Sequence, residues 1–225
     1  MAFGFVASRG TQNVGATGTV TLAAATGAGN PLVMAVAWNP NTASLTAGTD
    51  SKGNTWTLIK TLNSASKSTG FIYCNPATPL AIGDTVSPSF SGSGRTSVVS
   101  ILAEFSGGVV TLDGLGFATG AGGNASANNN VGAAANIGLV AIGTPSTAPG
   151  DYAVDTGWTA IANIQHATVG LCLGFHYKLN LAPGANTVTN VPVVGSAWAE
   201  ILADLIAGGT APPMLTDLMP MVGAS

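Results

Sequence analysis

The chain contains an internal repeat, because blocks of residues in its first half return in the same order in its second half. Residues 70–73 (Gly-Phe-Ile-Tyr) return as 174–177 (Gly-Phe-His-Tyr), and residues 101–105 (Ile-Leu-Ala-Glu-Phe) return as 201–205 (Ile-Leu-Ala-Asp-Leu). Three further pairs of blocks keep this order: 30–36 with 136–142, 50–57 with 155–159, and 80–86 with 181–188. The repeat therefore predicts two diverged copies of one folding unit.

The repeated blocks have the pattern of β-strands. Phe71 and Tyr73 in the first copy, and Phe175 and Tyr177 in the second, alternate with other residues at a period of two, which is typical of a strand with one face in a core. The intervals between blocks carry Asn-Pro, Gly-Asn, Pro-Gly and Gly-Ser-Gly sequences, which favour turns. Both copies are therefore predicted to be almost entirely β.

The repeat divides the chain into a first β-sandwich unit over residues 16–110 and a second over residues 111–209. About six strands per unit predict two tandem sandwiches of jelly-roll or immunoglobulin-like kind, or one large sandwich formed by their merger. Residues 196–207 would tolerate a helix, but their counterpart 97–105 is rich in Val and Ser, so we expect a strand in both. Residues 118–130, rich in Gly, Ala, Ser and Asn, are expected to form a flexible or irregular loop.

Both ends of the chain lie outside the repeat and are apolar. Residues 1–15 form an N-terminal arm, and residues 210–225 form a tail with a Pro-Pro pair and three Met residues. Exposed apolar segments of this kind favour contact with other protein, although either end could instead pack on its own sandwich. The predicted assembly contacts are Phe3, Phe5, Met214, Leu215, Leu218 and Met219.

Composition excludes several classes of protein. The longest apolar run, about residues 32–38, is far shorter than the roughly 20 residues of a membrane-spanning helix, so no membrane partner is expected. The six basic residues are scattered, which argues against nucleic-acid binding. Only 7% of residues are charged, and the polar remainder is largely Thr, Ser and Asn. Such a surface favours protein contacts, including a homo-oligomer.

The chain offers few groups for catalysis. Nine acidic residues and two histidines, His166 and His176, are too sparse to suggest a converging site, and no Gly-x-Ser-x-Gly motif occurs. We therefore expect no enzymatic activity, no cofactor and no metal. Cys74 and Cys172 lie in apolar runs and are expected to be buried free thiols.

Two groups of acidic residues allow a functional interpretation beside a structural one. Asp50 and Asn54 in a Gly-rich turn could bind calcium, but an Asx-turn is the favoured interpretation. Glu104 and Asp204 occupy the same point in both copies, which would suit a shared function. The favoured interpretation is that each carboxylate caps a turn or accepts hydrogen bonds from backbone amides near a sheet edge.

The four tryptophans form two groups. Trp56 and Trp158 occupy equivalent positions, which predicts core residues rather than sugar-binding platforms. Trp38 and Trp198 have no counterpart in the other copy. We therefore expect these two to form an exposed contact surface.

One stretch of the first copy resembles a known type of module. Residues 50–57 (Asp-Ser-Lys-Gly-Asn-Thr-Trp-Thr), followed by the segments 71–73, 83–86 and 103–107, resemble β-sandwich modules of tailed-bacteriophage virion proteins and of some bacterial surface proteins. The likeness extends over residues 17–209. The second copy lacks the Gly-Asn-Thr step, which favours a structural role for this turn.

The resemblance implies a structural virion protein, a minor tail protein near the host-facing tip, assembled in the host cytoplasm. Its implied partners are other virion proteins and copies of itself. Two alternatives remain open: a capsid decoration protein, and a surface module that uses aromatic residues to bind a host-surface glycan.

Overall fold

The computed structural model describes residues 3–39, 42–64, 67–132, 136–145, 153–154, 156–166, 168–191 and 197–208. In this part of the chain there are strands and turns only, and no helix that could span a membrane. The strands are β1 (Gly4–Gln12), β2 (Val20–Thr21), β3 (Leu32–Asn39), β4 (Ser44–Asp50), β5 (Trp56–Asn63), β6 (Ser68–Cys74), β7 (Thr85–Ser91), β8 (Ser97–Ser106), β9 (Val110–Ala121), β10 (Ala125–Val131), β11 (Asn136–Thr144), β12 (Ala153–Val154), β13 (Thr159–Gln165), β14 (Cys172–Leu179), β15 (Gly184–Val191) and β16 (Ala197–Ala207).

The strands form four antiparallel sheets, two in each half of the chain. The first half has a five-stranded sheet of order β1-β8-β3-β6-β5 and a three-stranded sheet of order β2-β7-β4. The second half has a five-stranded sheet of order β9-β16-β11-β14-β13 and a three-stranded sheet of order β10-β15-β12. The fold is therefore all-β with sandwich architecture, as the sequence predicts.

The two halves follow one strand order, with each strand number raised by eight in the second half. Phe71 lies in β6 and Phe175 in the corresponding β14, while Trp56 begins β5 and Trp158 directly precedes the corresponding β13. The repeated sequence blocks thus occupy matching strands. That the two halves arose by duplication remains a prediction from the repeat.

Residues 4–12 are strand β1, which pairs along its length with β8, so the N-terminal segment packs on its own sandwich, one of the two placements expected. Residues 118–130 differ from the expected loop because they are mostly strand, and β9 and β10 meet there at a short turn. Composition suggested a loop because Gly and Asn are disfavoured in strands, and packing between the layers overrides that preference. Residues 97–106 and 197–207 are strands in both halves, as expected.

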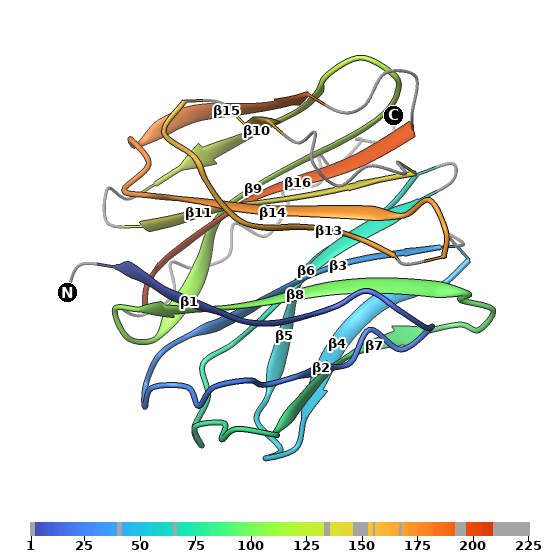
Figure 1. Cartoon of the computed structure of the whole chain (residues 1–225). Coiled ribbons are helices and arrows are strands. Elements are labelled where there is room, and N and C mark those ends of the chain that lie inside the picture. The colour runs from blue at the N-terminus through green and yellow to red at the C-terminus, as the bar shows by residue number, and fades with distance from the viewer. Residues whose placement is uncertain are drawn as a thin grey trace, which may run out of the picture.

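The four sheets stack in layers (Figure 1). The two five-stranded sheets pack face to face at the centre, and each carries its three-stranded sheet on its outer face. The chain passes from one half to the other through residues 107–109, where Gly107 and Gly108 adopt positive φ values of 124° and 87° that favour glycine.

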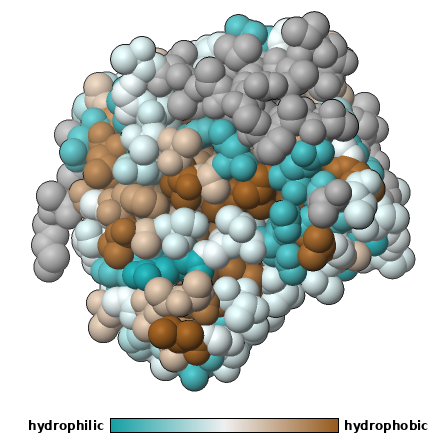
Figure 2. Space-filling view, viewed as in Figure 1, coloured by the Kyte–Doolittle hydropathy of each residue, from teal (hydrophilic) through white to brown (hydrophobic). Residues whose placement is uncertain are grey.

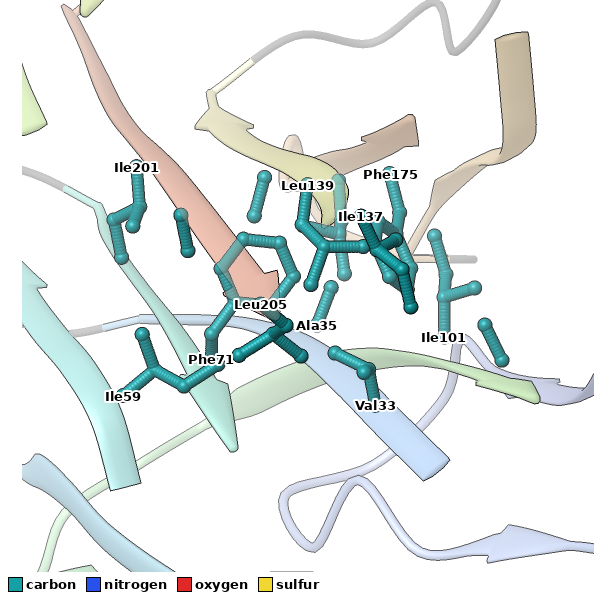
Figure 3. Packing of buried hydrophobic residues seen from close by; sticks show 14 of the residues in the cluster. Val33, Ala35, Ile59, Phe71, Ile101, Ile137, Leu139, Phe175, Ile201 and Leu205 are labelled. Carbon is teal, nitrogen blue, oxygen red and sulfur yellow. The ribbon is translucent and has the colours of Figure 1, made fainter. Parts of the chain in front are cut away.

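The largest hydrophobic cluster lies between the two five-stranded sheets (Figure 3). Phe71 and Phe175 meet at its middle, with ring centroids 5.2 Å apart and planes at 64°. Around them pack aliphatic side chains from both sheets: Val33, Ala35, Ile59, Ile101, Ile137, Leu139, Ile201 and Leu205. The molecule therefore has one core shared by both halves, in addition to the core of each sandwich.

The central packing is reciprocal. Strand β8 lies against β14, and in the same way β16 lies against β6; β3 lies against β14, and β11 against β6. The two equivalent phenylalanines touch each other, as residues near a two-fold axis do in a symmetric dimer. The halves are thus arranged about an approximate two-fold axis within one chain.

This arrangement explains the unusual composition. Strands β3, β8 and β11 are buried along almost their whole length because both faces of each central sheet are covered. Strands buried on both faces need continuous apolar runs rather than alternation. On the face seen in Figure 2, exposed apolar side chains form separate groups among polar and neutral ones. The scarcity of charge thus follows from the layered fold without any further partner.

Replacing Phe71 with Ala should lower the free energy of unfolding by about 3 to 5 kcal/mol, because it opens a cavity in the shared core. Combining Phe71→Ala with Phe175→Ala should cost about 0.5 to 1.5 kcal/mol less than the sum of the two, since the rings contact each other. Urea unfolding followed by tryptophan fluorescence measures both. Phe117→Ala, at a ring that is 49% exposed, is the control and should cost under about 1 kcal/mol. Equal effects at Phe71 and Phe117 would contradict the central packing.

Candidate functional site

Neither tryptophan predicted to form an exposed surface is exposed. Trp38 is fully buried in β3, and its indole N–H donates to the Ala43 carbonyl at 2.8 Å. Trp198 in β16 is 7% exposed and donates to the Gly122 carbonyl at 3.2 Å. Both side chains fill space between a five-stranded sheet and its three-stranded cover, and their N–H groups are satisfied there, so the prediction was wrong.

The register explains why these tryptophans lack counterparts in the sequence. Ala37 pairs with Val99 in the first half, and Gly143 pairs with Ala199 in the second. Trp38 follows Ala37 on β3, and Trp198 precedes Ala199 on β16. Because the paired strands run antiparallel, the two tryptophans lie at the same end of their residue pairs. Neighbouring strands thus supply the large side chain in the two sandwiches, and alignment of the copies cannot match them.

The N-terminal apolar residues pack on their own chain. Phe3 is 5% exposed, and the Phe5 ring stacks on Tyr177 of the second half with centroids 4.8 Å apart. Of the two placements expected for this segment, packing on the chain's own sandwich is the one observed, because the edge strand β1 completes the shared core. The other predicted assembly contacts, Met214, Leu215, Leu218 and Met219, lie outside the described residues.

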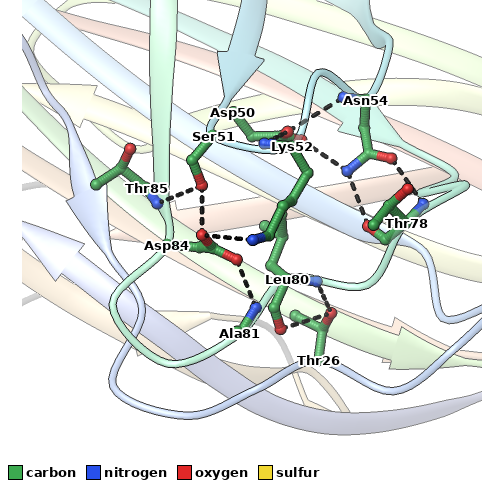
Figure 4. Close-up of polar contacts among 10 residues, drawn as sticks. All are labelled: Thr26, Asp50, Ser51, Lys52, Asn54, Thr78, Leu80, Ala81, Asp84 and Thr85. Carbon is green, nitrogen blue, oxygen red and sulfur yellow. Dashed lines mark hydrogen bonds and ion pairs between the residues drawn. The ribbon is translucent and has the colours of Figure 1, made fainter.

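The turn at residues 50–54 is an Asx-turn, as favoured from the sequence (Figure 4). One oxygen of Asp50 accepts from the Lys52 and Asn54 amides at 2.9 and 3.1 Å. The other accepts from the Trp56 indole at 2.9 Å and from the Asn54 side chain at 3.1 Å. Both oxygens thus bind protein donors, which leaves little capacity for calcium. Trp56 is buried, and Trp158 is half-buried.

A second turn, at residues 81–84, is hydrogen-bonded to the first. Asp84 accepts from the Ala81 amide at 2.6 Å and from the Ser51 hydroxyl at 2.7 Å, and it pairs with Lys52 at 3.4 Å (Figure 4). The backbone amide and the Ser51 hydroxyl hold the pKa of Asp84 below its usual value. Ile82, at the tip of this turn, is 72% exposed. We call residues 50–54 and 77–85 the loop cluster; it is a pre-ordered surface with one prominent apolar side chain.

The equivalent acids Glu104 and Asp204 are both fully buried but have different surroundings. Glu104 forms an ion pair with Arg9 of β1, and it accepts from the Gly27 amide at 2.8 Å and from the Asn30 side chain. This agrees with the favoured structural interpretation. Arg9 was not foreseen from the sequence, because it reaches Glu104 through a register shift between Ser8 and Gly10.

Asp204 faces another acid instead of a base. Burial, and then the nearby Asp113 carboxylate of β9, raise the pKa of Asp204 to about 8. Asp113 itself accepts from the Gly132 amide at 2.6 Å. Sequence reasoning missed Asp113, although an acid beside Gly114 in an otherwise apolar strand is a usable signal.

The histidines and cysteines do not converge on a site. His166 is 4% exposed in the turn after β13, and its Nδ1 lies 3.3 Å from the Thr168 amide. His176 is fully buried in β14, where burial lowers its pKa to about 4. Cys74 and Cys172 are buried free thiols, as predicted, and burial followed by the charge of Asp50 raises the pKa of Cys74 to about 12.

The described residues contain no group of three or more His, Cys, Asp or Glu side chains placed to hold a metal ion. Comparisons with protein families, with curated proteins and with solved structures found no match. A proposal for the function therefore rests on the arrangement of the described residues. The two main features of this arrangement are the exposed loop cluster, whose turns are hydrogen-bonded to each other, and the buried acids Glu104 and Asp204 of the two five-stranded sheets.

Replacing Arg9 with Leu should lower the free energy of unfolding by about 3 to 5 kcal/mol, because Glu104 is then left buried without its cation. Adding Glu104→Gln to Arg9→Leu should recover more than half of this loss, since the amide oxygen can still accept from Gly27 and Asn30. Urea unfolding of the two variants and the parent chain at pH 7 measures both effects. A double variant that is no more stable than Arg9→Leu would show that the ion pair is not the cause.

His176 should make the protein less stable in mild acid. Below about pH 6.5 the unfolded chain binds a proton at His176, whereas the folded chain does not until about pH 4. Stability is therefore lost as the pH falls from 6.5 to 4, by about 3 kcal/mol. His176→Ile, which copies Ile72 at the corresponding position, should remove this part of the loss. Urea unfolding at pH 7 and pH 4 measures the difference, and identical losses in both proteins would contradict it.

Proposed function

We propose that the chain is a non-enzymatic structural protein of a tailed-bacteriophage virion, a minor tail protein near the host-facing tip. It acts through contacts with other virion proteins and with copies of itself. The observation that carries the proposal is the loop cluster, an exposed surface whose polar groups bind each other and leave Ile82 outward. Its turn at residues 50–54 also belongs to the segment 50–57, the first of the segments that resemble virion modules.

A pre-ordered surface suits assembly. Ordering a flexible loop on binding costs about 1 to 2 kcal/mol per residue, and the loop cluster avoids this cost because it is already fixed. Asn54 shows how, since its side chain donates to the Thr78 carbonyl at 2.9 Å and accepts from the Thr78 amide at 2.9 Å. The Lys52–Asp84 pair also balances two of the three charged residues of the loop cluster, which suits a partner surface with little charge.

The glycan-binding alternative has less support. It would use exposed aromatic rings, but Trp38, Trp56 and Trp198 are buried and Trp158 is half-buried. Phe117 is 49% exposed, but the Lys60 ammonium lies over its ring, 3.8 Å from the centroid. A capsid decoration protein would use the same surface as a tail protein. The two roles are therefore distinguished by the position of the protein in the particle.

The apolar tail is expected to serve assembly. The sheets between residues 3 and 207 cover both faces of the central strands. Deleting residues 212–225 should therefore change the free energy of unfolding by less than about 1 kcal/mol and abolish incorporation into particles. Urea unfolding measures the first effect. Particles purified on a density gradient from cells that produce either form, and probed with an antibody, measure the second.

Gold labelling of the same particles tests the proposed position. Label at one end of the tail supports the proposal, whereas label spread over the capsid would indicate a decoration protein. Full-length chain that never sediments with particles would overturn the virion role. A truncated chain that unfolds far more easily, yet still incorporates, would show that the tail belongs to the core.

A further inference from the structure

Two acids of the second sandwich, the buried Asp204 and the partly exposed Asp113, lie at an irregularity in the sheet. Asp204 of β16 pairs with Gly114 of β9, while the next residue, Leu205, pairs with Leu112. Asp113 is the extra residue of this β-bulge. Bulges turn a side chain from its usual direction, and here Asp113 comes beside Asp204, close enough for the two carboxyl groups to interact directly.

In the first sandwich, the corresponding buried acid, Glu104, has a basic partner. There the extra residue beside Glu104 is Val6, and a second bulge, absent from β9, brings in Arg9. Strand β9 has Gly116 opposite Leu202 and contains no basic residue. The Lys60 ammonium lies over the ring of the next residue, Phe117, whose side chain points to the other face of the strand. The corresponding buried carboxylate in the second sandwich therefore has no protein cation in the place where Arg9 compensates Glu104.

Other charged groups on this face of the sheet do not fill the gap. Lys178 lies in the same row of the sheet as Asp204, since both pair with Gly138. Its ammonium group instead lies beside Gly157, 3.3 Å from the position that a Cβ atom would take there. Leu181 and Trp158 pack over Gly138, which separates Lys178 from Asp204. Glu200 and His176 occupy other rows of the same face and supply no positive charge, because His176 is neutral above about pH 4.

A third oxygen donor faces the pair from the covering sheet. Asn129 of β10 is 6% exposed, and neither polar atom of its side chain has a hydrogen-bond partner. Its Nδ2 lies 3.2 Å from the position that a Cβ atom would take at Gly114, the residue that pairs with Asp204. A turn of the amide by 180° brings its Oδ1 to the same place. Neither oxygen of Asp204 accepts from an N–H group, and its partner is another acid, Asp113. A buried amide without partners and two acids side by side are both costly, so these side chains together point to a missing ligand.

We propose that Asp113, Asp204 and Asn129 bind one calcium ion between the outer layers of the second sandwich. Two carboxylates and an amide oxygen are hard ligands of the type that calcium prefers, and the Asn130 carbonyl, 2.7 Å from the Cβ position of Gly114, can add a fourth oxygen. Calcium accepts irregular oxygen geometry, whereas magnesium demands a near-octahedral shell. The ion would occupy the electrostatic role that Arg9 has in the first sandwich.

Calorimetric titration of chelator-treated full-length protein with calcium chloride at pH 7.5 tests the site. One ion should bind per chain, and at a hundredfold excess over the dissociation constant the Tm should rise by at least about 5 °C. Asp204→Asn and Asp113→Asn should each weaken binding at least tenfold. Asp50→Asn is the matched control, because it removes an acid from the alternative calcium candidate, and it should bind calcium as the parent does.

Three results would overturn the proposal. If the parent chain gives no heat and no Tm change at 10 mM calcium chloride (about tenfold above the weakest protein sites), a shared proton alone holds the carboxyl pair. If Asp50→Asn abolishes binding, the ion lies in the turn of the loop cluster. If Asp204→Asn folds and binds calcium with unchanged affinity, the ion lies elsewhere.

Discussion

The contact between the two five-stranded sheets is the interaction on which the rest of the structure depends. Phe71 and Phe175 pack at its middle, and each central strand is covered a second time by its three-stranded sheet. Because both faces are buried, the central strands must be apolar throughout. Most charged side chains of the described residues therefore lie in loops or edge strands, and the few in inner strands are exceptions, which fits the 7% charged residues.

The two sandwiches show that one fold can tolerate different solutions at equivalent positions. Trp38 and Trp198 fill matching space from different strands, and Glu104 and Asp204 have a base and an acid as their respective neighbours. In each case the position is fixed by the sheet order, while the partner is free to change. The second sandwich has the more polar interior, with His176, Glu200 and Asp204 all fully buried.

The repeat and the alternation of Phe71 with Tyr73 were sufficient to predict strands, the all-β class and the correspondence of the halves. The exposure of Trp38 was predicted wrongly, because the sequence does not show that its register places it between the five-stranded sheet and its three-stranded cover. The sequence left two placements open for Phe3, since it does not show that the two sandwiches stack and share a core. The acids at Glu104 and Asp204 were found by comparing the copies. Their partners Arg9 and Asp113 were not, since both depend on bulges that shift the register.

The reciprocal packing also has a consequence for synthesis on the ribosome. The first half emerges with the apolar face around Phe71 uncovered, and about a hundred further residues must be translated before the second half can cover it. At about 5 to 20 residues per second, this interval lasts roughly 5 to 20 s. Neighbouring ribosomes on one message hold the same self-complementary face during that time. The short connection at Gly107 and Gly108 keeps the correct partner closest, so the linkage itself protects the nascent chain from pairing with its neighbours.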